Sequence, residues 1–289
     1  MSLVVSSSIS AATRVMDLHL HSSASDGCDS PRRVMQRARA AGLQAVALTD
    51  HDTVAGLAPA REEAARLGLQ FVEGVELSSA HEGKLVHILG HFIRLDAPAL
   101  TGQIDFYCVN RRGRMGRILE RLREIGVPID AGDFLRAYGT ASSIGRGQLG
   151  AYLVEKGLVG SREEAFRDLI GEGCPAYVSL DFITPFEAIR IIREAGGVAT
   201  LAHPILSAAD EIIPALAGAG LAGIEVEHPA QDDLARTHYR EMAARLGLLC
   251  MGGSDCHGGR PGPERMGRHN QPLRLLEELK ARRGRQAEP

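Results

Sequence analysis

Histidine and carboxylate side chains recur at or near the ends of short apolar runs along this sequence. Imidazole nitrogen and carboxylate oxygen, without thiolate sulfur, are the ligands that suit divalent manganese, iron or zinc. Nine candidates are too many for one tetrahedral ion, so we predict two or three divalent ions, manganese first, with zinc or iron as alternatives. The candidate metal ligands are His19, His21, Asp26, His51, Glu76, His87, His203, Asp255 and His257.

Clustered divalent ions favour one class of chemistry. They lower the pKa of a shared water and hold both the attacking and the leaving oxygens of a displacement, which serves the hydrolysis of phosphate esters above all. A carboxylate such as Glu76 would bridge two of the ions. A single histidine is more often structural than a ligand, so the prediction depends on the set as a whole.

Seven short apolar runs must position these side chains. They alternate with amphipathic segments such as Pro31–Ala41 and Leu57–Leu67, which begin and end at residues typical of helix boundaries. This alternation predicts parallel strands with right-handed crossovers, and seven strands predict a closed or nearly closed α/β barrel. Because parallel strands of a barrel open their carboxyl ends on one side, distant ligands would meet there. The runs are Val15–Leu20, Ala45–Thr49, Phe71–Leu77, Leu85–Phe92, Val198–Ala202, Ala222–Glu227 and Leu248–Gly252.

The stretch between Phe92 and Tyr177 interrupts this alternation, because it predicts helices and no convincing strand. We therefore predict a metal-binding barrel of residues 15–98 and 174–281, with a small helical domain inserted at 99–173 that caps the substrate. Residues 1–14 are Ser-rich and lack the charged and apolar regions of a secretory signal, so we predict a disordered extension.

Composition excludes several classes of protein. The 289 residues are 44% hydrophobic and 24% charged, as in a globular protein, and no apolar run is long enough to span a bilayer. A net charge of −3 argues against duplex DNA as a partner, and an aromatic content of 4% argues against broad surfaces that stack on bases. Five cysteines without a C-x-x-C pair indicate a reducing compartment, so we expect a cytoplasmic protein.

Several other polar residues have competing interpretations. His91 is the main alternative to His87 as a ligand, and Asp50 and Asp52 are candidates to orient ligand histidines. Cys256 lies between two candidate ligands, where strand alternation points it away, so we expect a buried thiol. We expect no metal role for His81, His91, His228, His238 and His269.

Five motifs resemble those of a known family in the same order. They are D-L-H-x-H-S (17–22) with S-D-G (25–27), T-D-H-D (49–52), G-V-E (74–76), A-H-P (202–204) and G-S-D-x-H (253–257). They resemble the polymerase-and-histidinol-phosphatase (PHP) superfamily. Within it, the chain is similar to bacterial metal-dependent phosphoesterases, a branch that includes nucleoside 3′,5′-bisphosphate phosphatases and an exonuclease that trims RNA from its 5′ end. The resemblance implies a distorted seven-stranded barrel and a trinuclear site formed by the nine ligands named above.

The resemblance also implies which residues approach the substrate phosphate. In that branch a helix with spaced arginines and a later G-R motif do so, and here these are Arg111, Arg114, Arg117 and Arg146. A solvated basic helix face is the alternative interpretation of the first three. This sequence departs from the branch at Gly147-Gln148, where a Pro or Thr and then His are usual. Gln148 cannot donate a proton as that His would, which leaves the substrate identity open.

The sequence therefore favours a phosphatase acting on a small phosphorylated nucleotide. The preferred hypothesis is conversion of a nucleoside 3′,5′-bisphosphate to the 5′-monophosphate by a metal-bridged hydroxide, with the general acid unidentified. Trimming of short RNA from its 5′ end by the same site is the first alternative. Hydrolysis of histidinol phosphate and a non-catalytic metal-binding module are the remaining ones.

Overall fold

The computed structural model describes residues 15–139, 143–258, 266–269 and 271–286, and the predicted N-terminal extension lies outside them. Seven strands form one sheet, in the same order as along the chain. The strands are β1 (Met16–Asp17), β2 (Ala45–Leu48), β3 (Gln70–His81), β4 (Lys84–His91), β5 (Val198–Leu201), β6 (Gly223–Glu227) and β7 (Leu249–Gly252). All seven predicted runs form strands, although β1 is shorter and β3 longer than expected.

The sheet curls into a nearly closed barrel. A parallel bridge between Leu20 and Cys256 joins its two edges just beyond the carboxyl ends of β1 and β7. At this bridge the amide of His21 donates a hydrogen bond of 3.0 Å to the carbonyl of Cys256. The predicted α/β barrel of seven strands is therefore confirmed.

The direction of β4 differs from the prediction that all strands run parallel. β4 pairs antiparallel with both β3 and β5, whereas the other neighbouring strands pair in parallel. Only a few residues separate β3 from β4, and a parallel crossover needs a dozen or more. Glu82 and Gly83 form a hairpin turn instead, with φ of 48° and 81°. The reversal places His87, in the first half of β4, at the edge where the parallel strands end.

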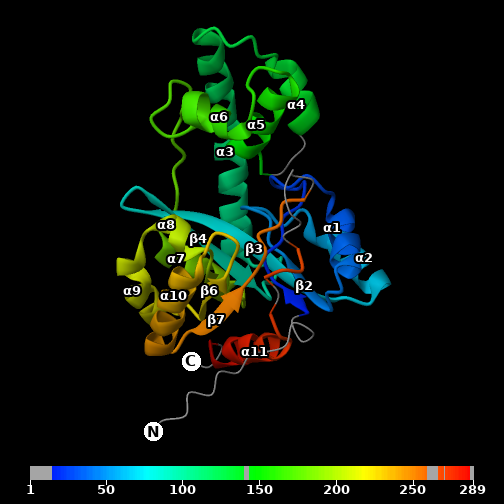
Figure 1. Cartoon of the computed structure of the whole chain (residues 1–289), viewed down its shortest axis with the longest axis vertical. Coiled ribbons are helices and arrows are strands. Elements are labelled where there is room, and N and C mark those ends of the chain that lie inside the picture. Colours follow the sequence, from blue (N-terminus) through cyan, green and yellow to red (C-terminus); the bar gives the residue numbers. More distant parts are fainter. Residues whose placement is uncertain (1–14, 140–142, 259–265, 270, 287–289) are drawn as a thin grey trace.

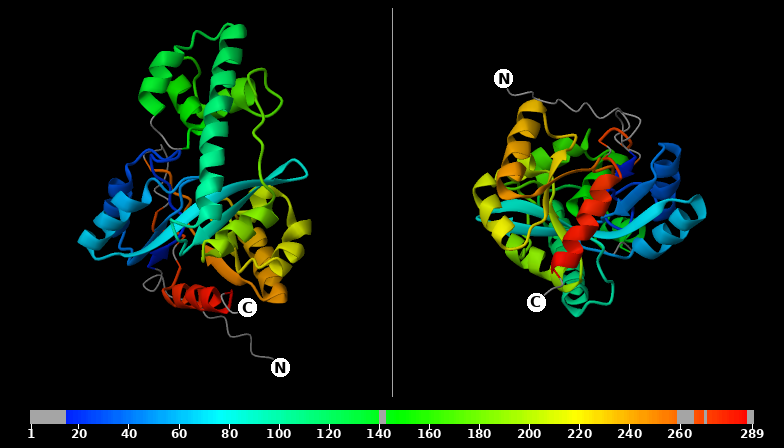
Figure 2. Two further views of the ribbon diagram at one scale, coloured as in Figure 1. Left: turned by 180° about the vertical axis from the view of Figure 1, so that it is seen from behind. Right: turned by 90° about the horizontal axis from the view of Figure 1, so that it is seen from below.

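Helices surround the barrel (Figures 1 and 2). Their first turns carry the expected caps, since Ser30 accepts a hydrogen bond from the amide of Arg33 and Thr184 forms a capping box with Glu187. Apolar residues of helices and strands share one main core beneath them. The barrel helices are α1 (Pro31–Ala40), α2 (Leu57–Leu67), α7 (Pro185–Glu194), α8 (Pro204–Ser207), α9 (Ile213–Gly218), α10 (Asp233–Leu246) and α11 (Arg274–Gln286).

A helical segment stands on one side of the barrel, opposite α11 (Figure 1). It comprises α3 (Pro98–Glu124), α4 (Ala131–Tyr138), α5 (Arg146–Glu155) and α6 (Arg162–Ala165), which continues into a π-helical turn, Phe166–Ile170. The described residues between 98 and 178 contain no strand, and side chains such as Leu122, Phe134 and Tyr152 form an apolar cluster of their own. Within the described residues, no helix has the length and apolar character needed to cross a membrane.

Candidate metal centre

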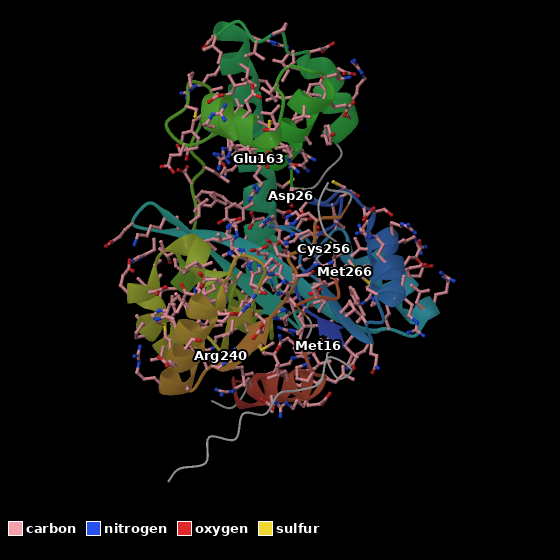
Figure 3. The ribbon with its side chains drawn as sticks, in the orientation of Figure 1. Met16, Asp26, Glu163, Arg240, Cys256 and Met266 are labelled. Carbon is pink, nitrogen blue, oxygen red and sulfur yellow. The ribbon has the colours of Figure 1, made fainter. Side chains whose placement is uncertain are left out.

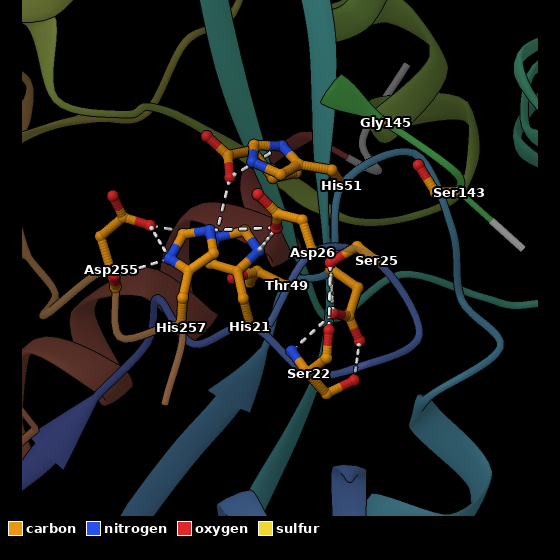
Figure 4. A network of polar contacts seen from close by, with 12 residues as sticks. His21, Ser22, Ser25, Asp26, Thr49, His51, Ser143, Gly145, Asp255 and His257 are labelled. Carbon is orange, nitrogen blue, oxygen red and sulfur yellow. Dashed lines mark hydrogen bonds and ion pairs between the residues drawn. The ribbon is translucent and has the colours of Figure 1, made fainter. Parts of the chain in front are cut away.

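The nine predicted ligands converge in one basin, at the side of the barrel that faces the helical segment. Figure 3 places Asp26 there, between the segment and the barrel, and Figure 4 shows His21, His51, Asp255 and His257 close by. His19 and His21 follow β1, His51 follows β2 and His203 follows β5. Strand ends distant in the sequence therefore deliver their polar side chains to one place, as the alternation of strands and helices predicts.

Three overlapping groups of these side chains have the spacing of metal ligands. In each group, one potential ligand atom from every residue lies within 4.8 Å of those from the others. The groups are His19, His21, Glu76 and Asp255; His21, Asp26, His51 and His257; and His51, Glu76 and His87. His203 completes the set, because its Nε2 atom lies 3.1 Å from Oε1 of Glu76. Glu76 belongs to two groups and is thus placed as a bridging carboxylate would be.

The buried nitrogen and oxygen atoms of these side chains are oriented for binding cations better than for hydrogen bonds to one another. Nδ1 of His87 lies 2.8 Å from Oε1 of Glu76, and Nδ1 of His51 lies 3.3 Å from Oε2. Neither nitrogen is oriented for a hydrogen bond, and Nδ1 of His21 and Oδ1 of Asp26 also lack a hydrogen-bond partner. Two ligands on one tetrahedral ion, at bonds of ~2.0–2.1 Å, are ~3.3 Å apart. The donor set therefore suits divalent ions that bind nitrogen and oxygen.

The charges of the cluster depend on one another. Burial disfavours the protonated form of His21, but hydrogen bonds and charges from Asp255 and Glu76 raise its pKa to about 10. Burial also opposes ionisation of Glu76, yet the surrounding imidazoles, His51 first, hold its pKa well below the usual range. For His51 burial prevails and lowers the pKa to about 3. Protons on some imidazoles thus balance the buried carboxylates, and a cation binding there would displace them.

The backbone is strained where it delivers several of these groups. Asp52, His203 and Asp255 have φ of 52°, 24° and 48°, a left-handed region that side chains disfavour. Such residues cost on the order of 1–3 kcal/mol each and persist where the surrounding structure holds them. Each of the three lies just beyond a strand or in the loop that follows it, next to or within the candidate ligand set.

Glu225 supports the ligands but was not predicted. Its carboxylate accepts hydrogen bonds from Nδ1 of His19 at 3.0 Å and from the amide of His203 at 2.8 Å. This contact fixes the His19 ring with Nε2 directed at Glu76, the arrangement by which carboxylates orient metal-binding histidines. Two apolar residues flank Glu225 in β6, and an acidic side chain inside a buried strand was the signal that could have revealed it.

His228 also lies closer to the centre than predicted. It is buried, and its Nε2 is 3.6 Å from Oδ2 of Asp255. His19, Glu225 and His228 have ligand-like spacing. However, Nδ1 of His19 already donates a hydrogen bond to Glu225 and is not available to a metal ion. We therefore interpret Glu225 and His228 as residues that orient the ligands and not as ligands themselves.

The structure decides two of the competing interpretations, those of His91 and of Cys256. Nε2 of His91 is 3.0 Å from the carbonyl of Leu18, so His87 and not His91 reaches Glu76. Cys256 is buried in the apolar core, as expected. The five cysteines form no disulfide.

Asp50 and Asp52 hold loops and not imidazoles. Asp50 accepts hydrogen bonds from the amide and hydroxyl of Ser22 and from the hydroxyl of Ser25, which fixes the loop that carries Asp26. Asp52 accepts a hydrogen bond from the amide of Ser78 and pairs with Arg111. The expectation that Asp50 and Asp52 orient ligand histidines is therefore wrong, because their partners are serine residues and Arg111.

A cavity of about 510 Å³ lies beside these ligands, between the barrel and the helical segment. Arg111, Arg114 and Arg146 line it, and so does Arg162, which was not predicted. Arg117 does not line this cavity and instead lines a separate depression with Arg121. The interpretation of Arg117 as part of an exposed basic helix face fits this position better than a role at the phosphate.

Arg114 and Arg146 are held without a carboxylate partner among the described residues. Nε of Arg114 donates to the carbonyl of Val178 at 2.7 Å, and Nη1 of Arg146 donates to that of Ile170 at 3.1 Å. The Cζ atom of Arg146 lies 5.5 Å from the centroid of the Phe166 ring and 5.3 Å from that of the Tyr177 ring. Burial and the neighbouring arginines lower the pKa of Arg114 to about 10. The cavity therefore presents positive charge that an anion would stabilise.

Known proteins share this architecture. The PHP domain family model matches residues 17–134. A crystal structure of a candidate metal-dependent phosphoesterase from Bifidobacterium adolescentis superimposes with a TM-score of 0.86, at 31% identity, over 93% of this chain and 96% of that one.

Three relatives match most of the chain. Phosphoribosyl 1,2-cyclic phosphate 1,2-diphosphodiesterase from Eggerthella lenta is 35% identical over 84% of this chain and 94% of its own. The 3′,5′-nucleoside bisphosphate phosphatase from Chromobacterium violaceum is 35% identical over 84% and 87%. The 5′-3′ exoribonuclease Rnm from Escherichia coli is 33% identical over 84% and 85%.

The chain belongs to the PHP family, which confirms the resemblance of its motifs. It is a metal-dependent phosphoesterase, a hydrolase of phosphoric esters, in the branch that contains the bisphosphate phosphatase.

Glu225→Gln tests how the ligands are supported. The neutral amide removes the anionic partner of His19, so we expect the affinity for Mn²⁺ to fall by about 10–100-fold in calorimetric titrations. Glu227→Gln is the matched control, because Glu227 lies on the same strand and pairs with Arg236 and Arg240 of α10. Equal affinities of the two variants, with unchanged circular dichroism, would contradict the role of Glu225.

The protonation of the cluster predicts how metal binding depends on pH. The raised pKa of His21 means that this imidazole is protonated at neutral pH before metal binds. Protons therefore compete with the metal, and the affinity should rise with pH by about tenfold per pH unit for each proton displaced. Calorimetry between about pH 6 and pH 8, in buffers of different ionisation enthalpy, counts these protons. An affinity that does not change with pH would refute the prediction.

Proposed function

We propose that this protein removes a phosphate from a small nucleotide, with a nucleoside 3′,5′-bisphosphate converted to the 5′-monophosphate as the preferred reaction. The observation that carries the proposal is the pairing of two anion-binding features in one cavity. Candidate ligands Asp26, His51 and His87 line the cavity, and so do the buried Arg114 and the half-buried Arg146, neither of which has a carboxylate partner among the described residues. A substrate with two phosphates matches both features.

The proposed roles follow from these positions. The nine candidate ligands hold two or three divalent ions, for which manganese is our first choice. Bound ions supply Lewis acidity to the reacting phosphate and to the water that attacks it. Arg114 and Arg146 bind the second phosphate with planar guanidinium groups that rigid contacts hold in place. The helical segment, residues 99–173, acts as a cap that limits the access of water.

Arg111 has a different proposed role. It is neutralised by Asp52 and also donates to Oγ of Ser78 at 3.0 Å. Since Asp52 follows the candidate ligand His51, this pair ties α3 to the metal centre. Arg111 therefore positions the cap, and its charge is less available to a phosphate than that of Arg114.

Two other substrates follow from the relatives. The Eggerthella lenta relative is named for a cyclic phosphodiester of phosphoribose, and the Escherichia coli relative for RNA. Both would use the same candidate metal centre. We further propose a cytoplasmic location, which the five cysteines without a disulfide support.

A direct assay tests the proposed function. Purified protein loaded with Mn²⁺ would be offered a nucleoside 3′,5′-bisphosphate, a phosphoribosyl cyclic phosphate and a short 5′-phosphorylated oligoribonucleotide. We expect the highest kcat/KM for the bisphosphate and none above background in a His19→Ala/Asp255→Ala double variant. A higher kcat/KM for either diester would replace the proposed substrate, and no turnover above the double variant would reject the proposal.

Arg114→Ala and Arg117→Ala form a matched pair on one helix. Loss of a hydrogen bond to a charged group costs about 1.5–3 kcal/mol, so Arg114→Ala should lower kcat/KM for the bisphosphate by roughly 10–150-fold. Arg117→Ala should leave it near the wild-type value, because Arg117 is exposed and does not line the cavity. Equal effects of the two changes would contradict the assignment of the second phosphate.

A further inference from the structure

One wall of the same cavity is apolar, and neither the candidate ligands nor the arginines account for it. Leu85 and Phe182 line the cavity together with His87 and Ser78. Leu85 remains 42% exposed, which is high for a leucine in a strand beside a buried cluster. A phosphate or a metal ion gains nothing from such a wall. The wall therefore points to an apolar part of the ligand.

The backbone next to Phe182 is anchored at this wall. The chain returning from the helical segment pairs with β3 through a parallel bridge between Ser79 and Ile183. The amide of Ala80 donates to the carbonyl of Ile183 at 2.9 Å, and the amide of Ile183 donates to the hydroxyl of Tyr107 at 3.2 Å. These bonds fix the backbone of the residue next to Phe182 and so hold its Cα atom at the edge of the cavity.

The Phe182 ring also rests against a rigid neighbour. Its centroid lies 6.4 Å from that of Tyr107, at an interplanar angle of 56°. Tyr107 is fully buried, and its hydroxyl donates to the carbonyl of Ser78. An aromatic ring fixed in this way loses little freedom when a second flat ring stacks on it.

The wall is adjacent to the candidate metal centre. In the β3–β4 ladder Ser78 is paired with His87, two residues beyond Glu76, and Leu85 lies two residues before His87 on the same face. Phe182 precedes Ile183 on the opposite side of β3. A molecule with its phosphates at the ions and at Arg114 would thus place a third part over Leu85 and Phe182.

We propose that Phe182, with Leu85 lining the same cavity, is the platform for the nucleobase of the substrate. This inference rests on the proposed nucleotide substrate. It adds the residue that would recognise the base, which is the part that distinguishes a nucleotide from a phosphosugar. A single ring is enough for one base, and stacking on an aromatic side chain is tolerant of base identity. The platform therefore selects for a base without selecting strongly among the bases.

A second cavity offers a rival place for the base. It has about 550 Å³, is lined by Tyr138 and small residues such as Ala55 and Ala151, and shares Asp26 and Arg162 with the first. Neither Arg114 nor Arg146 lines it. A base stacked there would lie outside the cavity that holds the second phosphate, which favours the Phe182 wall.

Binding of two probes tests the platform without requiring turnover. Adenosine 5′-monophosphate and ribose 5-phosphate share the sugar phosphate and differ in the base. In calorimetry with the Mn²⁺-loaded protein, we expect the wild type to bind the nucleotide about tenfold or more tightly than the phosphosugar. Phe182→Leu keeps apolar packing against Tyr107 but removes the ring, so this preference should largely disappear, while affinity for ribose 5-phosphate stays unchanged.

Two control variants sharpen the outcome. Phe182→Tyr retains the ring and should retain the preference, and Tyr138→Ala, in the second cavity, should also retain it. The platform is overturned if the wild type shows no preference, if Phe182→Leu keeps it, or if Tyr138→Ala removes it. Because these experiments measure binding and not turnover, they decide the platform independently of the proposed function. An absence of phosphatase turnover would reject the proposed function alone.

Discussion

Five imidazoles approach one buried carboxylate, and the rest of the structure depends on this contact. His19, His21, His51, His87 and His203 each place a ring nitrogen between 2.8 and 3.3 Å from an oxygen of Glu76. Isolated charges at this depth would cost far more than the ~5–15 kcal/mol by which a domain is stable. Such a crowded cluster is compatible with folding when protons on the imidazoles, or bound cations, neutralise the negative charge of the carboxylates.

The barrel provides this crowding by geometry. Parallel strands end on one side, and the antiparallel β4 begins on that side, so β4 contributes to the same basin as β1, β2, β3, β5 and β7. Glu225, in the interior of β6, then fixes the ring of His19 and the backbone of His203. The helical segment contributes Arg114 and Arg146 to the cavity beside the basin, so that bound cations and these guanidinium groups would leave a space suited to an anion.

The sequence predicted the barrel and the convergence of the ligands because both follow from local patterns. Short apolar runs identify strands, and polar residues at their ends identify the basin. The direction of β4 was missed although the few residues between Leu77 and Leu85 exclude a helical crossover. The pair between Asp52 and Arg111 could not be predicted, since it joins a loop to a helix through tertiary packing alone. Glu225 was missed because it lies between two apolar residues in the middle of its strand, and not at the strand's end.

Location of the ions tests the central claim most directly. A crystal grown with Mn²⁺, with anomalous scattering recorded at the manganese edge, would show where the metal binds. We predict two or three peaks within bonding distance of the nine side chains, with Glu76 touching more than one. An absence of peaks there, or peaks bound only at other sites, would contradict the account.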